Sequence, residues 1–401
     1  MTSSGALAAP VVETGVPGTA AIQHAVVAWE AGRITYVGPR DGYPGEVPFE
    51  AAGLVVPGFV DCHTHLPFVG WRDDEYEARL AGATYRDLHG RGGGIARSAR
   101  MLAEASDEEV LAFSRGLTDE MLEHGTTAFE MKTGYGLSVE AELRQARLAR
   151  RLAEEIPQTV TVTLLAGHAV PEGSSREAWV ERATNELIPR AAAEGLVDAV
   201  DVYVEDIAFT VEDLRRVAEA AAVAGLPVRC HAEQLGRTGA AEAAAELGAR
   251  SADHLNHLDA AGIEALARTA TTAVLLPAST LLLRAEPPPV AELVAREAEI
   301  ALASDLNPGT SPVLSMPEVL ALGGALYGLA PERMLPAVTA TPARVLGLDD
   351  RLGTIEVGKR ADLLVLDTLG FGSVPYRPGH NPVRRVVVGG VLREEGPWYR
   401  R

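Results

Sequence analysis

The central part of the chain alternates short apolar runs with longer segments rich in Ala, Leu and Glu. Eight apolar runs of strand length occupy residues 58–65, 126–132, 161–168, 198–206, 227–233, 251–255, 272–279 and 299–305. Each pair is separated by enough residues for a helix. Ser106 followed by Glu109 is typical of a capping box at a helix start, and Gly125 is placed to end that helix. Eight successive strand–helix units predict an α/β fold, a (β/α)8 TIM-like barrel with its helices outside.

At both ends of the chain the sequence pattern changes to short strand-like segments separated by Gly/Pro turns. We therefore expect residues 1–57 and 346–401 to form together a small β-sandwich domain beside a barrel of residues 58–345. The main alternative is an open, doubly wound sheet. That alternative usually carries a glycine-rich phosphate fingerprint after the first strand, which this sequence lacks, and eight regular units favour closure.

Composition narrows the class of protein. The chain has 401 residues, of which 47% are hydrophobic, and its net charge is −19, which argues against nucleic acid and anionic membranes as partners. No run of 18 apolar residues occurs, and the N-terminus lacks the basic and apolar regions of a signal peptide. Two cysteines, Cys62 and Cys230, are consistent with a reducing compartment. These features predict a cytoplasmic protein.

Side chains with metal-binding and acid–base chemistry gather at the predicted strand ends, where barrel enzymes place their active sites. Five of the ten histidines lie there, and the full set is His63, His65, Lys132, His168, Glu205, His231, His254 and Asp305. A lone strand histidine is usually a core residue, and an aspartate in "DLNPG" could cap a turn. Together they are hard to explain as packing, because buried imidazoles and carboxylates are costly unless paired or metal-bound.

In an extended strand, His63 and His65 point to the same face. We therefore predict one divalent metal ion bound by His63, His65, His231 and Asp305, a ligand set that suits Zn²⁺ or Fe²⁺ and leaves a position for water. Cys62 and Cys230 each precede a predicted ligand, so alternation turns both outward, where a cysteine packs as a small hydrophobe. We expect neither a thiolate ligand nor a disulfide.

Several segments resemble the amidohydrolase superfamily and, within it, the imidazolonepropionase family of histidine degradation. The matching segments are "GFVDCHTH", "TGYGLS", "GHAVP", "RCHAEQ", "SADHL", "ASDLNPGTSP" and the tail "GTIEVGKRADLLVLD". The resemblance implies one zinc or iron ion (Fe²⁺ or Fe³⁺), a small anionic heterocyclic substrate and a homodimer. It also implies catalytic roles for Asp305, His254 and Gln234, and substrate contacts from Arg72, Tyr85, Tyr135, His168, Asn307, Gly309 and Thr310.

The reaction that the resemblance implies is hydrolysis of the cyclic amide of 4-imidazolone-5-propanoate to N-formimino-L-glutamate. The alternative is a deaminase of a heterocycle, in which the pattern His-x-x-Glu supplies a proton-shuttling glutamate. Here the third residue after His231 is Gln234, which cannot carry a proton, and Glu233 alternates toward the other face. A non-catalytic relative would be expected to lack metal ligands that are all present here.

Two cations need separate interpretations. Dinuclear members of the superfamily use a carboxylated lysine at the end of the fourth strand, whereas Lys132 ends the second, so we expect Lys132 to form a structural ion pair or to hold the "TGYG" loop. An anionic substrate in a protein of net charge −19 needs a local cation. Arg72 is either that carboxylate clamp or a surface partner of Asp73, Asp74 or Glu75.

Overall fold

The computed structural model describes residues 3–90 and 92–393, except the side chains of Tyr85 and His89. Its larger sheet consists of eight parallel strands in sequence order. They are β6 (Phe59–Asp61), β7 (Thr126–Lys132), β8 (Thr159–Gly167), β9 (Ala199–Val204), β10 (Val228–Ala232), β11 (Ser251–His254), β12 (Thr272–Leu275) and β13 (Ile300–Leu302). All eight strands predicted from the sequence are present.

Backbone contacts between the first and last strands close this sheet. Just beyond β6 and β13, the N–H of Asp305 donates to the carbonyl of His63 at 3.0 Å, and the N–H of His65 donates to the carbonyl of Leu306 at 2.8 Å. Closure therefore places two predicted metal-binding segments in direct register. The predicted barrel is confirmed.

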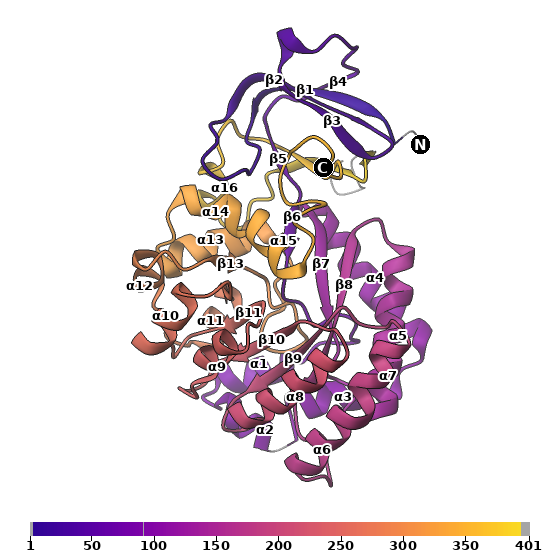
Figure 1. Ribbon diagram of the computed structural model, residues 1–401, viewed down its shortest axis with the longest axis vertical. Coiled ribbons are helices and arrows are strands. Elements are labelled where there is room, and N and C mark those ends of the chain that lie inside the picture. Colours follow the sequence, from indigo (N-terminus) through magenta and orange to yellow (C-terminus); the bar gives the residue numbers. More distant parts are fainter. Residues whose placement is uncertain (1–2, 91, 394–401) are drawn as a thin grey trace.

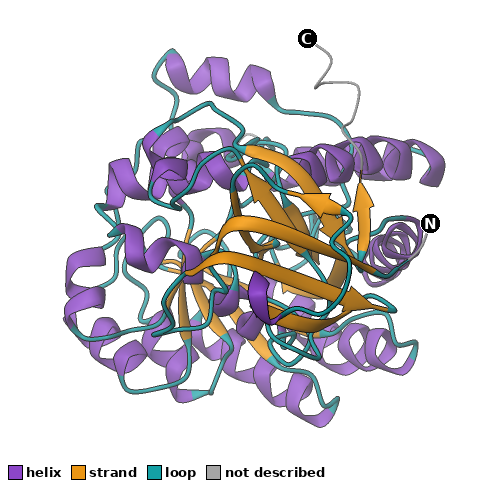
Figure 2. Ribbon diagram, turned by 90° about the horizontal axis from the view of Figure 1, so that it is seen from above, coloured by secondary structure: helices purple, strands orange, loops and turns teal. Residues whose placement is uncertain are grey.

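Helices surround the strands, as Figure 2 shows from above. Ser106 and Glu109 form both hydrogen bonds of the predicted capping box at the start of α4, and Gly125 follows the helix with a φ of 91°. The helices are α1 (Asp73–Leu80), α2 (Tyr85–Gly90), α3 (Ile95–Glu104), α4 (Asp107–Glu123), α5 (Val139–Glu155), α6 (Arg176–Arg182), α7 (Ile188–Ala193), α8 (Val211–Val223), α9 (Ala240–Glu246), α10 (Ala260–Ala267), α11 (Pro277–Leu283), α12 (Val290–Ala295), α13 (Met316–Tyr327), α14 (Pro331–Ala337), α15 (Ala340–Leu346) and α16 (Ser373–Tyr376).

Both ends of the chain contribute to the second sheet, which has the strand order β16-β15-β14-β5-β1-β2-β3, with β4 beside β1. Its strands are β1 (Gly5–Val12), β2 (Ile22–Glu30), β3 (Arg33–Pro39), β4 (Phe49–Glu50), β5 (Leu54–Pro57), β14 (Leu363–Leu366), β15 (Val383–Val388) and β16 (Val391–Arg393). Gly32, between β2 and β3, packs against Gly389 and Gly390, between β15 and β16. The sheet therefore curls until its ends touch, so the sandwich-like domain consists of one continuous hydrogen-bonded sheet.

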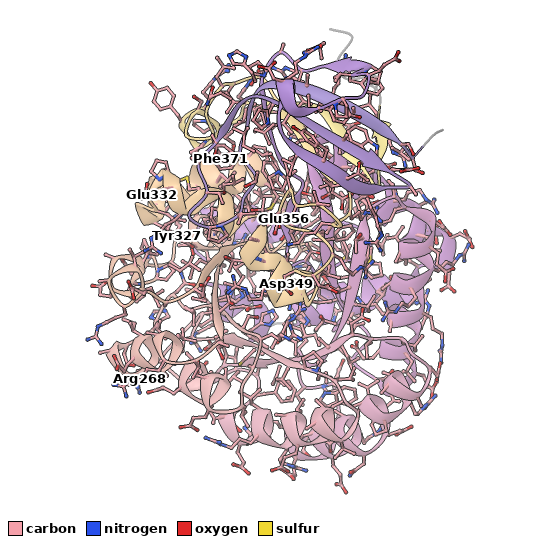
Figure 3. The ribbon with its side chains drawn as sticks, turned by 45° about the horizontal axis from the view of Figure 1, so that its top comes forward. Arg268, Tyr327, Glu332, Asp349, Glu356 and Phe371 are labelled. Atoms are coloured by element: carbon pink, nitrogen blue, oxygen red, sulfur yellow. The ribbon has the colours of Figure 1, made fainter. Side chains whose placement is uncertain are left out.

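The terminal sheet lies at the N-terminal ends of the barrel strands, because β6 begins one residue after β5. Figure 1 shows α1, α2 and α3 at the opposite end of the barrel. Phe371 lies at the junction, just below the terminal sheet (Figure 3). Its ring packs edge-on against Phe59 of β6, with centroids 6.4 Å apart. The strand ends that carry the predicted site consequently face away from the terminal domain.

The cysteines behave as expected from alternation. Cys62 lies in an apolar cluster with Ala343, Val345 and Leu346 of α15, and Cys230 lies in the main apolar core. Both thiols are buried and unlinked. Among the described helices, none combines the length and the apolar character that crossing a membrane requires.

Candidate metal centre and active site

Four predicted ligands converge at the C-terminal end of the barrel. Nε2 of His65 lies 3.3 Å from Nε2 of His63, 3.5 Å from Nε2 of His231 and 3.3 Å from Oδ1 of Asp305. Nε2 of His63 lies 3.5 Å from the same carboxylate oxygen. All four side chains are buried.

These separations suit donor atoms that would share one metal ion. With metal–nitrogen bonds of about 2.0–2.1 Å, two donor atoms about 3.3–3.4 Å apart subtend a near-tetrahedral angle at the ion. The four measured separations lie between 3.3 and 3.5 Å. Three imidazole nitrogens and a carboxylate oxygen also form a donor set that zinc and ferrous iron accept. The residues present therefore fit the predicted ion.

Carboxylates behind two of the histidines orient their rings. Nδ1 of His63 lies 2.6 Å from Oδ2 of Asp253, and Nδ1 of His231 lies 3.1 Å from Oδ2 of Asp201. An Nδ1–H that donates to a carboxylate leaves the Nε2 lone pair directed at the metal position. Neither aspartate is among the site residues predicted from the sequence. Asp201 was visible as an acidic residue inside an apolar strand. Alternation from the neighbouring site residue His254 would instead have turned Asp253 to the other face, and the φ of 79° at His254 shows that regular alternation ends there.

A buried ionic layer lies against these aspartates. Nζ of Lys132 is 2.6 Å from Asp201 and 2.9 Å from Glu130, and Glu130 also pairs with Arg229. The structural ion pair predicted for Lys132 is thus present. Lys132 belongs to β7, and β9, the strand whose end would carry a metal-bridging lysine, contains no lysine.

Burial governs the protonation of the histidines. It lowers the pKa of His63, His65 and His168 well below the ordinary value and lowers the pKa of His254 to about 3. The positive charge of Lys132 lowers the pKa of His63 further. These rings are therefore neutral near pH 7, and each keeps a nitrogen lone pair.

One pocket joins three of the four predicted ligands to most of the predicted substrate contacts. It is lined by His65, Arg72, Ile95, Tyr135, His168, Tyr203, His231, Gln234, His254, Asp305, Asn307 and Thr310. The ring of His168 stacks on His65, with centroids 5.2 Å apart, and its Nδ1 is 2.9 Å from the carbonyl of Gly134. Ile95 and Tyr203 are not among the site residues predicted from the sequence. Tyr203 follows Asp201 by two residues in β9, so alternation could have placed it inside the barrel.

Arg72 lines the pocket and pairs with Glu75, one of the acidic neighbours considered for it. Its side chain is only 3% exposed and lines the pocket, so it is not a surface ion pair. Nε donates to Oε2 of Glu75 at 3.0 Å, Nη1 donates to Ser98, and the guanidinium lies against Gly309. A Cβ on Gly309 would overlap Nη2 at 1.9 Å, so only glycine leaves room for this arginine.

The segment after Asp305 forms a tight loop organised by one asparagine. Oδ1 of Asn307 accepts from the N–H of Gly309 at 2.9 Å and of Thr310 at 2.7 Å, while its Nδ2 donates to the carbonyl of Asp305. Asn307 and Thr310 line the pocket, whereas Gly309 lies beside it behind Arg72. Tyr85 begins α2, and its side chain lies outside the described residues.

Around the end of β10, the residues separate as alternation predicts. Gln234 lines the pocket, whereas Oε1 of Glu233 accepts from the backbone N–H of Gly239 at 3.0 Å. Glu205 is buried beside the pocket and accepts from the N–H of Leu235. Neither glutamate is among the residues that line the pocket.

Comparison with known proteins agrees with this geometry. The amidohydrolase family model matches residues 54–392. An imidazolonepropionase from Methylobacterium nodulans is 43% identical over 373 residues, which cover 92% of this chain and 93% of that protein. An imidazolonepropionase from Paracoccus denitrificans is 42% identical over 379 residues, covering 92% and 94%.

Solved structures show the same fold at lower identity. An adenosine deaminase from Xanthomonas campestris with bound zinc has a TM-score of 0.72 at 20% identity, with 97% of this chain and 92% of that chain covered. Guanine deaminase from E. coli has a TM-score of 0.72 at 17% identity, with coverages of 98% and 99%. The fold is thus shared widely, while the extensive sequence identity is to imidazolonepropionases. The chain belongs to the amidohydrolase family of hydrolases and, within it, to the imidazolonepropionase family.

Proposed function

We propose that this pocket hydrolyses the cyclic amide of 4-imidazolone-5-propanoate to give N-formimino-L-glutamate. Water adds to the ring carbonyl carbon, the adjacent C–N bond breaks, and the freed nitrogen takes up a proton. The observation that carries the proposal is one pocket lined by His65, His231 and Asp305, three of the four predicted ligands, together with the buried Arg72. The cluster suits amide hydrolysis, and the arginine suits the substrate's carboxylate.

His63, His65, His231 and Asp305 would hold one divalent ion, for which zinc and iron are both suitable. When bound, such an ion supplies Lewis acidity that lowers the pKa of water and polarises a carbonyl. Asp305 then accepts a proton from the attacking water through its carboxylate. His254, neutral because of its burial, donates a ring N–H to the carbonyl oxygen as negative charge develops there.

The other residues that line the pocket orient the substrate. Arg72 binds the propionate, because a guanidinium has five N–H groups and only two take part in the hydrogen bonds described above. Tyr135 and His168 flank the ring, and Gln234 supplies a neutral amide beside it. Asn307 and Thr310 shape the floor, Gly309 makes room for Arg72, and Tyr85 on α2 is retained as a proposed substrate contact.

Gln234 argues against the deaminase alternative. A hydrolytic deaminase needs a carboxylate that moves a proton, and the amide of Gln234 lines the pocket where that group would be expected. Release of ammonia from cyclic amidines would favour the alternative. Stoichiometric formation of formiminoglutamate without ammonia would favour the proposal.

The direct test follows imidazolone absorbance with purified protein. We expect turnover to stop after treatment with a chelator and to return when Zn²⁺ or Fe²⁺ is added. Turnover unaffected by complete metal removal would contradict the proposal. The metal identity, the homodimer and the cytoplasmic location remain proposals supported by the family resemblance.

A further inference from the structure

Beneath the proposed ligands, a single ammonium faces three carboxylates. Nζ of Lys132 lies 2.6 Å from Asp201, 2.9 Å from Glu130 and 3.8 Å from Asp253. All four side chains have no solvent exposure. A buried charge is costly to maintain unless it is closely paired, so this placement needs a reason beyond packing.

Two of these carboxylates also contact the proposed metal ligands, and they do so through the oxygens nearest Lys132. Oδ2 of Asp201 lies 2.6 Å from Nζ and 3.1 Å from Nδ1 of His231. Oδ2 of Asp253 lies 3.8 Å from Nζ and 2.6 Å from Nδ1 of His63. The ammonium therefore stands between the two acceptors that orient two different ligand rings.

The ion pairs around Lys132 show that it, and not Arg229, is the cation that contacts the two aspartates. Glu130 pairs with Arg229 as well as with Lys132, whereas the hydrogen bonds of Arg229 go to Glu130 and the carbonyl of Val345. Lys132 is consequently the cation in direct contact with the Asp201–Asp253 pair among the described residues. Without it, two carboxylates would repel each other in the barrel interior.

We propose that Lys132 is a positioning residue of the metal centre. By holding Asp201 and Asp253 in place, it keeps Nδ1–H of His231 and His63 engaged and their Nε2 atoms directed at the ion. The proposal rests on the metal site of the proposed function. It extends that site by one layer and assigns a role to a lysine that contacts neither metal nor substrate.

The test measures metal binding rather than turnover. Protein stripped with a chelator would be titrated with Co²⁺ in competition with a chromogenic chelator, and the visible Co²⁺ spectrum would be recorded. Lys132→Met should lower the Co²⁺ affinity about 10–100-fold and change the spectrum, as loss of outer hydrogen-bond partners usually does. Arg229→Met is the matched control, because it removes the other buried cation from Glu130, while the hydrogen bonds and the ion pair described for Arg229 go to Glu130 and Val345 and to neither aspartate. We expect its Co²⁺ affinity to stay within about threefold of the wild type.

A second variant covers the case in which Lys132→Met does not fold. Lys132→Gln keeps a neutral donor near Asp201 and should still lower the affinity about tenfold. Wild-type affinity and spectrum in a folded Lys132 variant would overturn the inference. An equal loss in Arg229→Met would also overturn it, because the effect would then be a general loss of core stability.

The two proposals fail in different ways. Wild-type protein whose Co²⁺ binding is absent, or is unchanged by His231→Ala, would contradict the metal centre itself and the inference with it. Wild-type protein that binds Co²⁺ through His231, combined with unchanged binding in a Lys132 variant, would contradict the inference alone.

Discussion

Replacing Arg72 with alanine should selectively impair hydrolysis of an anionic substrate. The guanidinium is 3% exposed and held through Nε by Glu75 and through Nη1 by Ser98, so its remaining N–H groups are presented in a fixed orientation. A hydrogen bond to a charged group is worth about 1.5–3 kcal/mol. Loss of that bond should therefore lower kcat/KM roughly 10–150-fold. Most of the loss should appear in KM, because the propionate is remote from the bond that breaks.

The structure also shows why a control is needed. Oε1 of Glu75 accepts from the N–H of Gly94, so removing Arg72 leaves a buried carboxylate with one partner fewer and can disturb the turn before α3. Arg79→Ala is the matched control, since Arg79 donates to the carbonyl of Gly309 in the same loop but does not line the pocket. Its kcat/KM should remain within a few fold of the wild type.

The assay compares 4-imidazolone-5-propanoate with an imidazolone that lacks the carboxylate. Wild type and Arg72→Ala should process the neutral compound about equally poorly. Arg72→Lys should recover only part of the activity on the acid, because an ammonium cannot form two parallel hydrogen bonds. An equal penalty on both compounds would refute the reasoning and show that Arg72 only supports the loop.

Three further expectations concern the metal, the chemistry and stability. Elemental analysis should approach one zinc or iron per chain, and His231→Ala should lower that occupancy sharply; two equivalents of comparable affinity would contradict a single centre. Asp305→Asn should abolish turnover, and His254→Ala should lower kcat roughly 10²–10³-fold, whereas near-normal kcat would remove His254 from its role. Burial raises the pKa of Glu205 from 4.5 to about 7, so folding loses stability as the pH rises through that range. Glu205→Gln should therefore raise Tm more at pH 8 than at pH 5, and an equal gain at both would contradict that pKa.

Periodicity was sufficient to predict most of the fold. The barrel strands are nearly continuous apolar runs because helices cover their outer face, and their spacing identifies the connecting helices. The curling of the terminal sheet was harder to predict from the sequence, since the contact between Gly32 and Gly389 joins segments more than 350 residues apart. No local pattern encodes that approach. The expected domain boundaries at 57/58 and 345/346 remain predictions.

The site residues proposed from the sequence lie at the strand ends. The residues that support them, one layer deeper in the barrel, were not proposed. His63, His65, His231 and Asp305 lie close together, because barrel closure brings strand ends to one mouth, and their role as metal ligands stays a prediction. Asp201 and Asp253, which contact the histidine rings, lie deeper in the barrel interior. In the sequence each is a single acidic residue in an apolar strand, and such a residue does not by itself indicate a place in the site. Of the two partners of Arg72, Glu75 was among the neighbours considered from the sequence, whereas Ser98 was not, since it reaches Arg72 from a separate helix.

The same interior layer bears on how many metal ions the barrel can hold. Asp201, His231 and Asp253 place ligand atoms close enough together to form a second candidate cation cluster. Lys132 already supplies a positive charge there, 2.6 Å from Asp201 and 3.8 Å from Asp253. A second divalent ion would have to displace a buried ammonium whose own carboxylate partners would then be left unbalanced. The structure therefore favours one metal ion above the ammonium over two metal ions side by side. Gln234, a neutral amide in the pocket of the proposed single centre, is consistent with opening an amide without an additional proton shuttle.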